Sequence, residues 1–442
     1  MTAVAFYTLG CKVNQYESEA IMDLFKENGY QIVDFQDKAD IYIINSCTVT
    51  NLAASKSRKY ARRAKRRNQK ATVVMVGCYS QVSPEEIEEI EEVDLILGTE
   101  NKAEIVDLIE KNSDTDSGEK YLDKIQNHEQ LKQFENLNIK ELRETTRGYI
   151  KIQEGCNQYC SYCIIPYARG PLRSRGLKSI LKEVKGLVNQ GVKEIVLTGI
   201  HLGAFGYERD NKQALNQLLK KLIKIDGLTR IRLSSLEITE INEELMHIIK
   251  NEEKVCPHLH IPLQSGCNKI LKKMRRPYNK EEFKCKVKKI RKMIPGIAIS
   301  TDVMVGFPGE TAEDFKKTYD FINQISFSRL HVFPYSPREG TPAAEMDNQL
   351  SGDIKNSRSK KLRNLNQKLM VNYQKKFLGT DKKIIIETEK VINNQKFWSG
   401  LTNNYLKILI KKDTGINYGQ GDIVKVRLKE IYNYQNILGI II

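Results

Sequence analysis

The chain has 442 residues, of which 40% are hydrophobic and 29% charged, and its formal net charge is +16. This length predicts about two to four domains of ordinary size, with enough apolar material for packed cores. Residues 1–10 have no basic segment, and no apolar run approaches the roughly 20 residues of a membrane helix. We therefore expect a cytoplasmic protein without signal peptide or membrane contact. The positive charge favours an anionic partner such as nucleic acid, with lysines that only maintain solubility as the alternative.

The N-terminal part, residues 1–111, alternates between strand-like and helix-like patterns. Strands are expected at residues 4–9, 40–45, 72–76 and 93–97. Helices are expected at residues 17–28, at 52–68, from the Ser83-Pro84 cap onward, and at 103–110. This alternation predicts an α/β domain with a Rossmann-like parallel sheet and helices on its faces.

Residues 112–145 are polar and poor in periodicity, which predicts a linker. The alternation resumes in residues 146–377. Strands are expected at 149–153, 194–197, 230–233, 258–262, 297–304 and 329–333, with helices between them at 177–189, 214–225, 280–293 and 312–324. Six such units predict a complete or partial (β/α) barrel of the TIM type, closed by a long basic helix over residues 351–377.

The C-terminal part, residues 378–442, contains short strand-like runs with turn residues between them. KKIIIET, YLKILI, DIVKVRL and NILGIII are the clearest of these runs. Several short strands at this spacing predict a small β-barrel.

Three cysteines, Cys156, Cys160 and Cys163, stand in C-x3-C-x2-C spacing directly after a predicted strand. Thiolates are the usual ligands of iron–sulfur clusters, and three ligands to a four-iron cubane leave one iron open. S-adenosylmethionine (SAM) can chelate that iron, and an electron from the cluster then yields a 5′-deoxyadenosyl radical. A zinc site is the alternative, but zinc usually takes four ligands in C-x2-C pairs and no fourth ligand is nearby.

Three further cysteines each follow a predicted parallel strand, in YTLG-Cys11, YIINS-Cys47 and VVMVG-Cys78. Ligands of open parallel sheets bind at the carboxyl ends of the strands, so these cysteines can converge on one point. Gly10 and Gly77 let the backbone approach a bulky cofactor closely. We expect a second 4Fe–4S cluster with an open iron here, with buried structural cysteines as the alternative. The remaining cysteines are expected to be structural: Cys256, Cys267 and Cys285.

The order of these six cysteines resembles the radical SAM methylthiotransferase family over nearly the whole chain. The resemblance implies an N-terminal cluster domain, a radical SAM barrel and a C-terminal TRAM domain, which is a small RNA-binding β-barrel. It also implies that the chemistry occurs on two 4Fe–4S clusters with SAM, without an acid–base side chain. One SAM would methylate a sulfur on the N-terminal cluster, and a second SAM would supply the radical.

The motifs LGCKVNQYESE, NSCTVTN, GCYSQ, GTENK and KIQEGCNQYCSYCIIPYARGPLRSR are similar to those of the branch that acts on N6-threonylcarbamoyladenosine in tRNA. Other branches usually read GCQMN or GCPKN where this chain has GCKVN. The resemblance thus implies addition of a methylthio group to carbon 2 of that nucleoside at position 37. It implies tRNA as a partner, together with a sulfur source and an electron donor such as flavodoxin or ferredoxin.

Three alternatives to this function stay open at the level of sequence. Two are methylthiolation of isopentenyladenosine in tRNA and of a ribosomal protein aspartate. The third is a non-catalytic, metal-containing tRNA-binding protein.

Candidate SAM contacts share a position at the carboxyl ends of predicted strands or in the cluster loop. They are Tyr162, Thr198, Gly199, Ser234, Ser235, Glu237, Gln264 and Gly306. Tyr162 resembles the family's aromatic residue near the SAM adenine, and Thr198-Gly199 resembles the motif that contacts the SAM amino group. Each residue alone could equally be a loop-former, but their shared placement favours contact with SAM. Packing rather than catalysis is expected for His201, His258 and His260.

Two basic segments are candidate RNA contacts. Residues 56–70 form a predicted helix after the second cluster cysteine and contribute Arg58, Arg62, Arg63 and Arg66. The C-terminal β-barrel contributes Lys425 and Arg427, beside aromatic residues. A phosphate-binding face is the functional interpretation of both, and a solvated charged face is the alternative.

Overall fold

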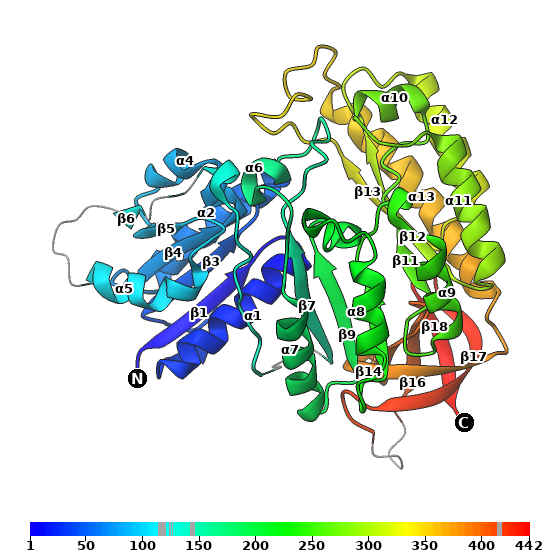
Figure 1. Ribbon diagram of the computed structural model, residues 1–442, viewed down its shortest axis with the longest axis horizontal. Coiled ribbons are helices and arrows are strands. Elements are labelled where there is room, and N and C mark those ends of the chain that lie inside the picture. Colours follow the sequence, from blue (N-terminus) through cyan, green and yellow to red (C-terminus); the bar gives the residue numbers. More distant parts are fainter. Residues whose placement is uncertain (114–120, 123–124, 126, 142–145, 413–417) are drawn as a thin grey trace.

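The computed structural model describes residues 1–113, 121–122, 125, 127–141, 146–412 and 418–442. Three regions follow one another along the chain: an N-terminal sheet, a central barrel and a C-terminal barrel (Figure 1). Part of the predicted linker, residues 112–145, lies outside the described residues. Within the described part, no helix is long and apolar enough to cross a membrane.

The N-terminal region is a six-stranded parallel sheet in the order β2-β1-β3-β4-β5-β6. Its strands are β1 (Ala3–Thr8), β2 (Gln31–Val33), β3 (Ile41–Ser46), β4 (Thr72–Gly77), β5 (Leu95–Leu97) and β6 (Tyr121–Leu122). Its helices are α1 (Lys12–Glu27), α2 (Asn51–Arg67), α3 (Cys78–Val82), α4 (Pro84–Glu88) and α5 (Ile105–Ser113). One apolar core lies on each face of the sheet, as the predicted Rossmann-like arrangement requires.

Several elements of the N-terminal region differ from the sequence prediction: β2, β6 and α3 were not predicted, and α1 begins earlier. Strand β2 is only three residues long, and all three are half-exposed or exposed. The sequence therefore shows no long apolar run there, and the strand was not predicted. Helix α1 begins at Lys12, five residues earlier than the predicted start at Glu17. The helix therefore starts directly after Cys11, which is its N-terminal flanking residue.

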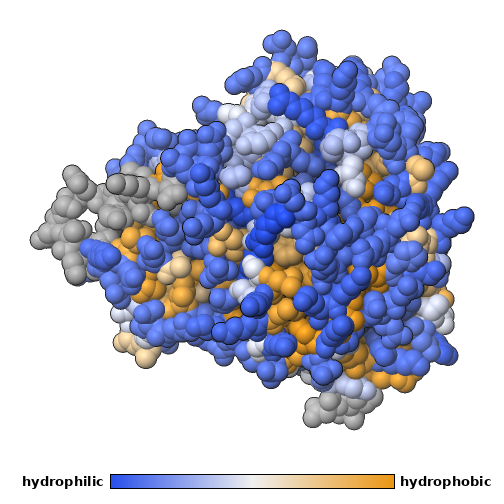
Figure 2. Space-filling model, viewed as in Figure 1, coloured by the Kyte–Doolittle hydropathy of each residue, from blue (hydrophilic) through white to orange (hydrophobic). Residues whose placement is uncertain are grey.

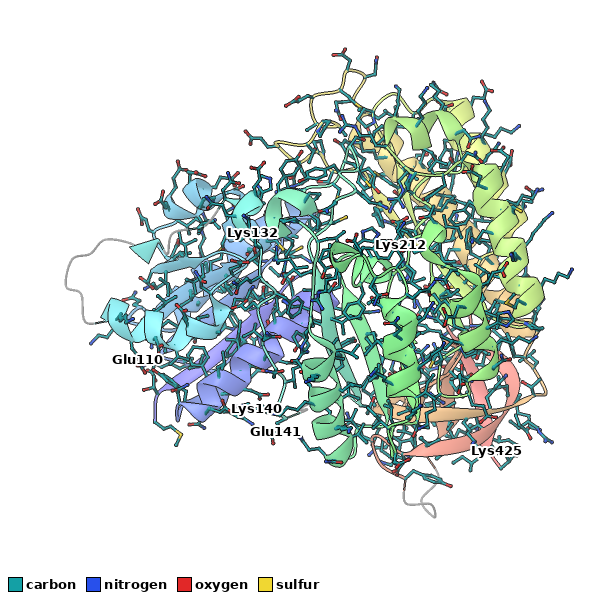
Figure 3. All side chains as sticks on the ribbon, in the orientation of Figure 1. Glu110, Lys132, Lys140, Glu141, Lys212 and Lys425 are labelled. Carbon is teal, nitrogen blue, oxygen red and sulfur yellow. The ribbon has the colours of Figure 1, made fainter. Side chains whose placement is uncertain are left out.

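Residues 137–141 of the predicted linker pack along α1, whereas Tyr121–Leu122 form β6 of the sheet. Leu137 and Ile139 are buried, and the backbone N–H of Lys140 donates to Asp23 at 2.7 Å. Glu141 forms an ion pair with Lys26 at 2.7 Å, and Figure 3 shows Lys140 and Glu141 beside this helix. Residues 127–141 are thus a docked connection between the sheet and the central barrel.

The central region contains six parallel strands in two hydrogen-bonded sets, β7-β9-β10 and β11-β12-β13. These strands are β7 (Arg147–Glu154), β9 (Glu194–Gly199), β10 (Arg230–Leu233), β11 (His258–His260), β12 (Ala298–Val305) and β13 (Arg329–Pro334), and β8 (Arg173–Ser174) adds an antiparallel edge. Parallel bridges Ile231–Val255 and Ser235–His260 join the two sets into one curved sheet. This is the predicted partial (β/α) barrel.

Helices cover the outside of this barrel and enclose the largest apolar core of the molecule. They are α7 (Leu177–Asn189), α8 (Ala214–Leu222), α9 (Glu243–Asn251), α10 (Asn268–Lys273), α11 (Lys280–Met293), α12 (Ala312–Ile325) and α13 (Gly352–Lys375), whereas α6 (Ile165–Arg169) packs against α3 of the N-terminal region. Helix α13 is the predicted long basic helix, and it leads into the C-terminal region (Figure 1).

The C-terminal region is a closed barrel in the order β14-β15-β16-β18-β17. Its strands are β14 (Asp381–Ile392), β15 (Gln395–Thr402), β16 (Lys407–Lys411), β17 (Ile423–Asn433) and β18 (Asn436–Ile441). It is attached to the amino ends of the central strands. Glu194 holds Arg232 at 2.8 Å and Arg230 at 3.5 Å, and Arg230 donates to the backbone carbonyl of Leu401 at 2.8 Å.

The surface of the molecule is mostly hydrophilic. On the face shown in Figure 2, apolar residues gather mainly in the lower half, while hydrophilic residues cover most of the rest. This distribution agrees with a chain in which 29% of the residues are charged.

Candidate active site at two cysteine triads

The first triad, Cys156, Cys160 and Cys163, lies on one loop that leaves the carboxyl end of β7. The loop starts at Gly155, whose φ is +71° and where an added Cβ would lie 1.8 Å from the backbone oxygen of Pro171. Only glycine fits this turn. Cys156 N–H donates to the Gly170 carbonyl and Cys163 N–H to the Cys160 carbonyl, both at 3.0 Å. Backbone contacts therefore hold the loop that presents the three thiols.

The second triad is assembled from the ends of three strands, as predicted. Cys11 follows β1 and a short turn, while Cys47 and Cys78 directly follow β3 and β4. At Gly10, an added Cβ would lie 3.1 Å from the Cys47 sulfur; at Gly77, with φ +108°, it would lie 2.7 Å from the Asn45 amide oxygen. The glycines that precede Cys11 and Cys78 thus allow close approach of the strand ends.

The chemistry of both triads fits iron–sulfur clusters better than single metal ions. Among the described residues, no three His, Cys, Asp or Glu side chains are arranged to hold one metal ion. Burial, with Cys78 as the strongest charged neighbour, raises the pKa of Cys47 to about 12. Burial and neighbouring Cys160 likewise raise the pKa of Cys163 to about 12. Such thiols need a strongly cationic partner to become thiolates. A cluster places one iron at each thiolate, so its positive charge reaches thiols that are farther apart than the ligands of a single ion.

Each triad has one buried arginine that donates to a cysteine sulfur. Arg169, on α6, places Nε 3.1 Å from the Cys78 sulfur. Arg276 places Nη1 3.3 Å from the Cys160 sulfur and 3.4 Å from the Tyr162 hydroxyl. Hydrogen bonds to ligand sulfurs stabilise the thiolate and tune the cluster that it binds. Both arginines were absent from the residues predicted from sequence.

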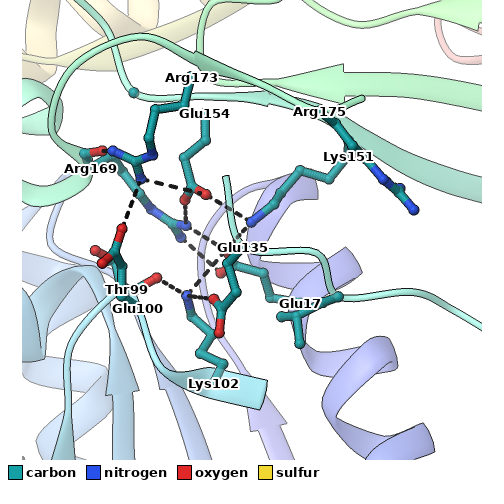
Figure 4. A network of polar contacts seen from close by, with 12 residues as sticks. Glu17, Thr99, Glu100, Lys102, Glu135, Lys151, Glu154, Arg169, Arg173 and Arg175 are labelled. Atoms are coloured by element: carbon teal, nitrogen blue, oxygen red, sulfur yellow. Dashed lines mark hydrogen bonds and ion pairs between the residues drawn. The ribbon is translucent and has the colours of Figure 1, made fainter. Parts of the chain in front are cut away.

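Arg169 is also the centre of a buried ionic network between the N-terminal region and β7 (Figure 4). Its Nη1 lies 2.5 Å from carboxylate oxygens of both Glu17 on α1 and Glu154 on β7. Lys151 lies 2.9 Å from the same two carboxylates. Burial alone would raise the pKa of Glu154, but Lys151 and Arg169 lower it to about 2. Glu154 therefore stays ionised, and the network links helix α1 of the N-terminal region to the strand that precedes the first triad.

A cavity of about 720 Å³ opens beside the second triad. All three regions of the chain line it: Cys11 and Lys12 from the sheet, Tyr405 and Lys407 from the C-terminal barrel, and polar residues of the central barrel. Four predicted SAM contacts are among the lining residues: Thr198, Gly199, Ser234 and Ser235. This volume is in the range of small-molecule sites and can hold a nucleoside.

Two other predicted SAM contacts, Tyr162 and Glu237, lie together next to the first triad. Arg276 forms an ion pair with Glu237 and contacts the Tyr162 hydroxyl, so one buried guanidinium joins both to Cys160. The structure therefore divides the predicted contacts between the cluster loop and the cavity.

Gln264 and Gly306, the last two predicted SAM contacts, do not line this cavity. Gln264 has φ +65° and a buried side-chain oxygen without a hydrogen-bond partner among the described residues. Gly306 has φ +73°, and its N–H donates to Glu310 at 2.7 Å. A Cβ at Gly306 would lie 2.4 Å from Lys355. Their role toward SAM stays a prediction.

His258 and His260 line the cavity and also contact neighbouring side chains, so a packing role for the histidines stays a prediction. His260 lies 3.1 Å from Asp302 and 2.9 Å from the Ser300 hydroxyl. His258 stacks on Tyr405 of the C-terminal barrel, with ring centroids 4.5 Å apart. His201 lies beside the first triad, with Nδ1 3.7 Å from the Cys156 sulfur.

The predicted RNA contacts lie on α2 and on the C-terminal barrel. On α2, Arg58 pairs with Glu86 at 3.6 Å and Arg62 with Glu92 at 3.8 Å, while Arg63 lies over the Tyr60 ring. Arg66 is exposed. Lys425, labelled in Figure 3, and Arg427 share the carboxylate of Asp381 at 3.7 and 2.7 Å. Binding of RNA by these residues stays a prediction.

Two family models match the chain. The model described as "Uncharacterized protein family UPF0004" matches residues 3–98, the segment that contains the second triad. The model of the radical SAM superfamily matches residues 150–322, which include the first triad.

Curated relatives match almost the whole chain. The "Threonylcarbamoyladenosine tRNA methylthiotransferase MtaB" of Bacillus subtilis is 43% identical over 98% of this chain and 95% of its own length. The "tRNA-2-methylthio-N(6)-dimethylallyladenosine synthase" of Methylacidiphilum infernorum is 37% identical over 97% of this chain and 93% of its own length. Both kinds of relative thus span the sheet and both barrels.

A solved structure with a similar fold is the radical S-adenosylmethionine methyltransferase TsrM of Kitasatospora setae, with cobalamin and a [4Fe-4S] cluster bound. It has a TM-score of 0.58 and 16% identity, and the match covers 78% of this chain and 77% of that one. At this identity the similarity concerns the fold alone.

Proposed function

The chain belongs to the radical SAM methylthiotransferase family, and on that premise we propose that it adds a methylthio group to carbon 2 of N6-threonylcarbamoyladenosine at position 37 of tRNA. The observation that carries the proposal is the single cavity that Cys11, the central strand ends and the C-terminal barrel line together. A flipped nucleoside in it would reach the N-terminal cluster while its RNA lies against the outer surfaces.

The cofactors are two 4Fe–4S clusters and SAM. We assign Cys156, Cys160 and Cys163 to one cluster and Cys11, Cys47 and Cys78 to the other. When bound, the clusters supply the radical and the sulfur transfer that an aromatic C–H requires, since no side chain is basic enough to remove that hydrogen as a proton.

The chain's own residues position these groups. Arg169 and Arg276 each donate to one ligand sulfur of a triad. Thr198 and Ser234 present polar groups to the cavity, where they can hold SAM. The ionic network of Figure 4 holds α1, which follows Cys11, against β7, which precedes Cys156.

A sulfur source and an electron donor such as flavodoxin or ferredoxin complete the reaction in the cytoplasm. Lys425 and Arg427, with the arginines of α2, are the proposed phosphate contacts.

The decisive experiment is mass spectrometry of nucleosides from tRNA incubated with anaerobically reconstituted protein, SAM, sulfide and a reductant. The expected product is the 2-methylthio form of threonylcarbamoyladenosine. Formation of 2-methylthio-isopentenyladenosine instead would reassign the nucleoside, and an absence of any SAM cleavage would overturn the assignment as an enzyme. Modification of a ribosomal protein without modification of tRNA would reassign the substrate class.

A further inference from the structure

The proposed substrate differs from its closest chemical alternative in charge. The threonylcarbamoyl group ends in a carboxylate and a hydroxyl, whereas the isopentenyl group is a neutral hydrocarbon. A site that selects the first must offer a cation to the carboxylate. The inference below rests on the proposed function and names the residue that makes this selection.

The charges that line the cavity come from four basic and two acidic side chains. Three of these six charged side chains already contact a partner. Arg147 lies 2.9 Å from Glu387, and Asp302 lies 3.1 Å from His260. Both lining carboxylates are thereby engaged, and the cations that remain are Lys12, Arg329 and Lys407.

Lys12 is the cation best placed to meet the substituent of a bound nucleoside. It is half-buried, it follows Cys11 directly, and it forms no ion pair with a carboxylate among the described residues. Tyr405 and Arg147, which also line the cavity, lie near it. By contrast, Arg329 is exposed, and Lys407 lies on the C-terminal barrel beside Lys390.

The geometry of adenine relates Lys12 to the substituent. Carbon 2 and the carbon that carries N6 belong to the same six-membered ring, so a base with carbon 2 directed at the Cys11 cluster holds its N6 substituent a few bonds away. The long side chain of the residue next to Cys11 can span that separation. We propose that Lys12 binds the carboxylate of the threonylcarbamoyl group and thereby selects this nucleoside over neutral N6-substituted adenosines.

The test measures binding of anticodon stem-loop RNA to the reconstituted protein by fluorescence anisotropy. Three RNAs carry threonylcarbamoyladenosine, its carboxylate methyl ester, or isopentenyladenosine at the target position. With the unaltered protein, the ester should bind about 10- to 100-fold more weakly than the free carboxylate, the range expected for loss of one charge-assisted contact. This arm needs no protein variant, so folding cannot obscure it.

Substitution then assigns the contact to Lys12. Lys12→Gln should weaken the carboxylate RNA about 10- to 100-fold and leave the ester and isopentenyl RNAs unchanged, so that the carboxylate preference disappears. Lys12→Arg should keep the preference. Lys26→Gln, on the exposed side of the same helix, is the matched control and should leave all three affinities unchanged. Iron content and circular dichroism verify that each variant is folded and loaded.

The outcomes separate this inference from the proposed function. Equal weakening of all three RNAs by Lys12→Gln would make Lys12 a general phosphate contact and overturn the inference. Equal binding of acid and ester by the unaltered protein would do the same. In either case, formation of 2-methylthio-threonylcarbamoyladenosine would leave the function intact, whereas preference for isopentenyladenosine as substrate would overturn both.

Discussion

The two cysteine triads reach similar surroundings by opposite routes. Cys156, Cys160 and Cys163 occupy one short loop after one strand, whereas Cys11 and Cys78 are brought together from strands separated by most of the N-terminal sheet's sequence. Both triads nevertheless contain buried thiols and one arginine that donates to a sulfur. A local loop and a folded sheet edge can thus build the same kind of ligand set.

The difference lies in what holds each triad. The loop depends on its own backbone hydrogen bonds and on Gly155, while the convergent triad depends on the packing of the whole sheet and on the network around Arg169. Stability and cluster binding should therefore be more closely coupled in the N-terminal region than in the loop.

The largest expected effect separates the two triads by their chemistry. Cys47→Ala should abolish methylthiolation but retain SAM cleavage, whereas Cys160→Ala should abolish both, because only the second removes the SAM-binding cluster. Iron should fall in each variant by about half, from about eight to about four atoms per chain. Iron analysis and detection of 5′-deoxyadenosine measure these outcomes. Retention of methylthiolation in Cys47→Ala would contradict the two-cluster assignment.

The next effect concerns the arginines. Arg169→Leu leaves the buried carboxylates of Glu17 and Glu154 short of a partner and should lower the free energy of unfolding by about 3–5 kcal/mol. Arg276→Leu should cost less, because Glu237 keeps partial access to water. Anaerobic urea denaturation followed by circular dichroism measures both. Lys317→Ala, which removes an exposed pair, is the control and should leave the urea midpoint unchanged. Equal losses of unfolding free energy in Arg169→Leu and Arg276→Leu would show that the two triads do not differ in their coupling to stability.

A finer comparison uses the cluster potentials. Arg276→Gln removes a donor to the Cys160 sulfur and should lower the potential of that cluster by tens of millivolts, where about 59 mV is a tenfold change for one electron. The donor stabilises the more negative, reduced cluster, so its loss makes reduction harder. Redox titration by electron paramagnetic resonance, in a background without the other triad, measures the shift. Arg169→Gln should shift only the cluster of Cys78, and a shift of the distant cluster would show that the effect is not local.

The smallest effect concerns RNA binding by the helix that follows Cys47. Replacing Arg58, Arg62, Arg63 and Arg66 with glutamine should reduce the slope of log Kobs against log salt concentration for tRNA binding by up to about 3.6, at about 0.7–0.9 per lost phosphate contact. Replacing Lys425 and Arg427 should flatten it less per charge, because both already share Asp381. Binding titrations over a series of salt concentrations measure the slopes. An unchanged slope in the α2 variant would make that helix a solvated face.

Sequence reasoning reached the parts of the site that local pattern determines. The spacing of Cys156, Cys160 and Cys163 is visible in one motif, and the convergence of Cys11, Cys47 and Cys78 follows from the rule that parallel strands end at one edge. The sheet, the partial barrel and the closed C-terminal barrel follow from hydrophobic periodicity in the same way.

What sequence reasoning missed depends on contacts between distant segments. Glu17 on α1 and Arg169 on α6 are 152 residues apart, and only the packing of the N-terminal region against the central region brings them together. The available signal was chemical: Lys151, Glu154 and Arg169 are charged residues that flank a cluster motif in otherwise buried segments. Such residues must be paired to be buried, but their partners cannot be read from spacing.

The way in which the C-terminal barrel is attached to the central region affects which substitutions the barrel tolerates. Arg230 and Arg232 donate to the main-chain carbonyls of Leu401 and Asn403, and every amino acid supplies such a carbonyl. Substitution of Leu401 or Asn403 therefore leaves these hydrogen bonds available. Loss of Glu194, by contrast, would leave the guanidinium groups of Arg230 and Arg232 without their carboxylate partner. The barrel can accordingly vary its outer strands toward different nucleic acids over evolutionary time while its anchorage to the catalytic region remains constant.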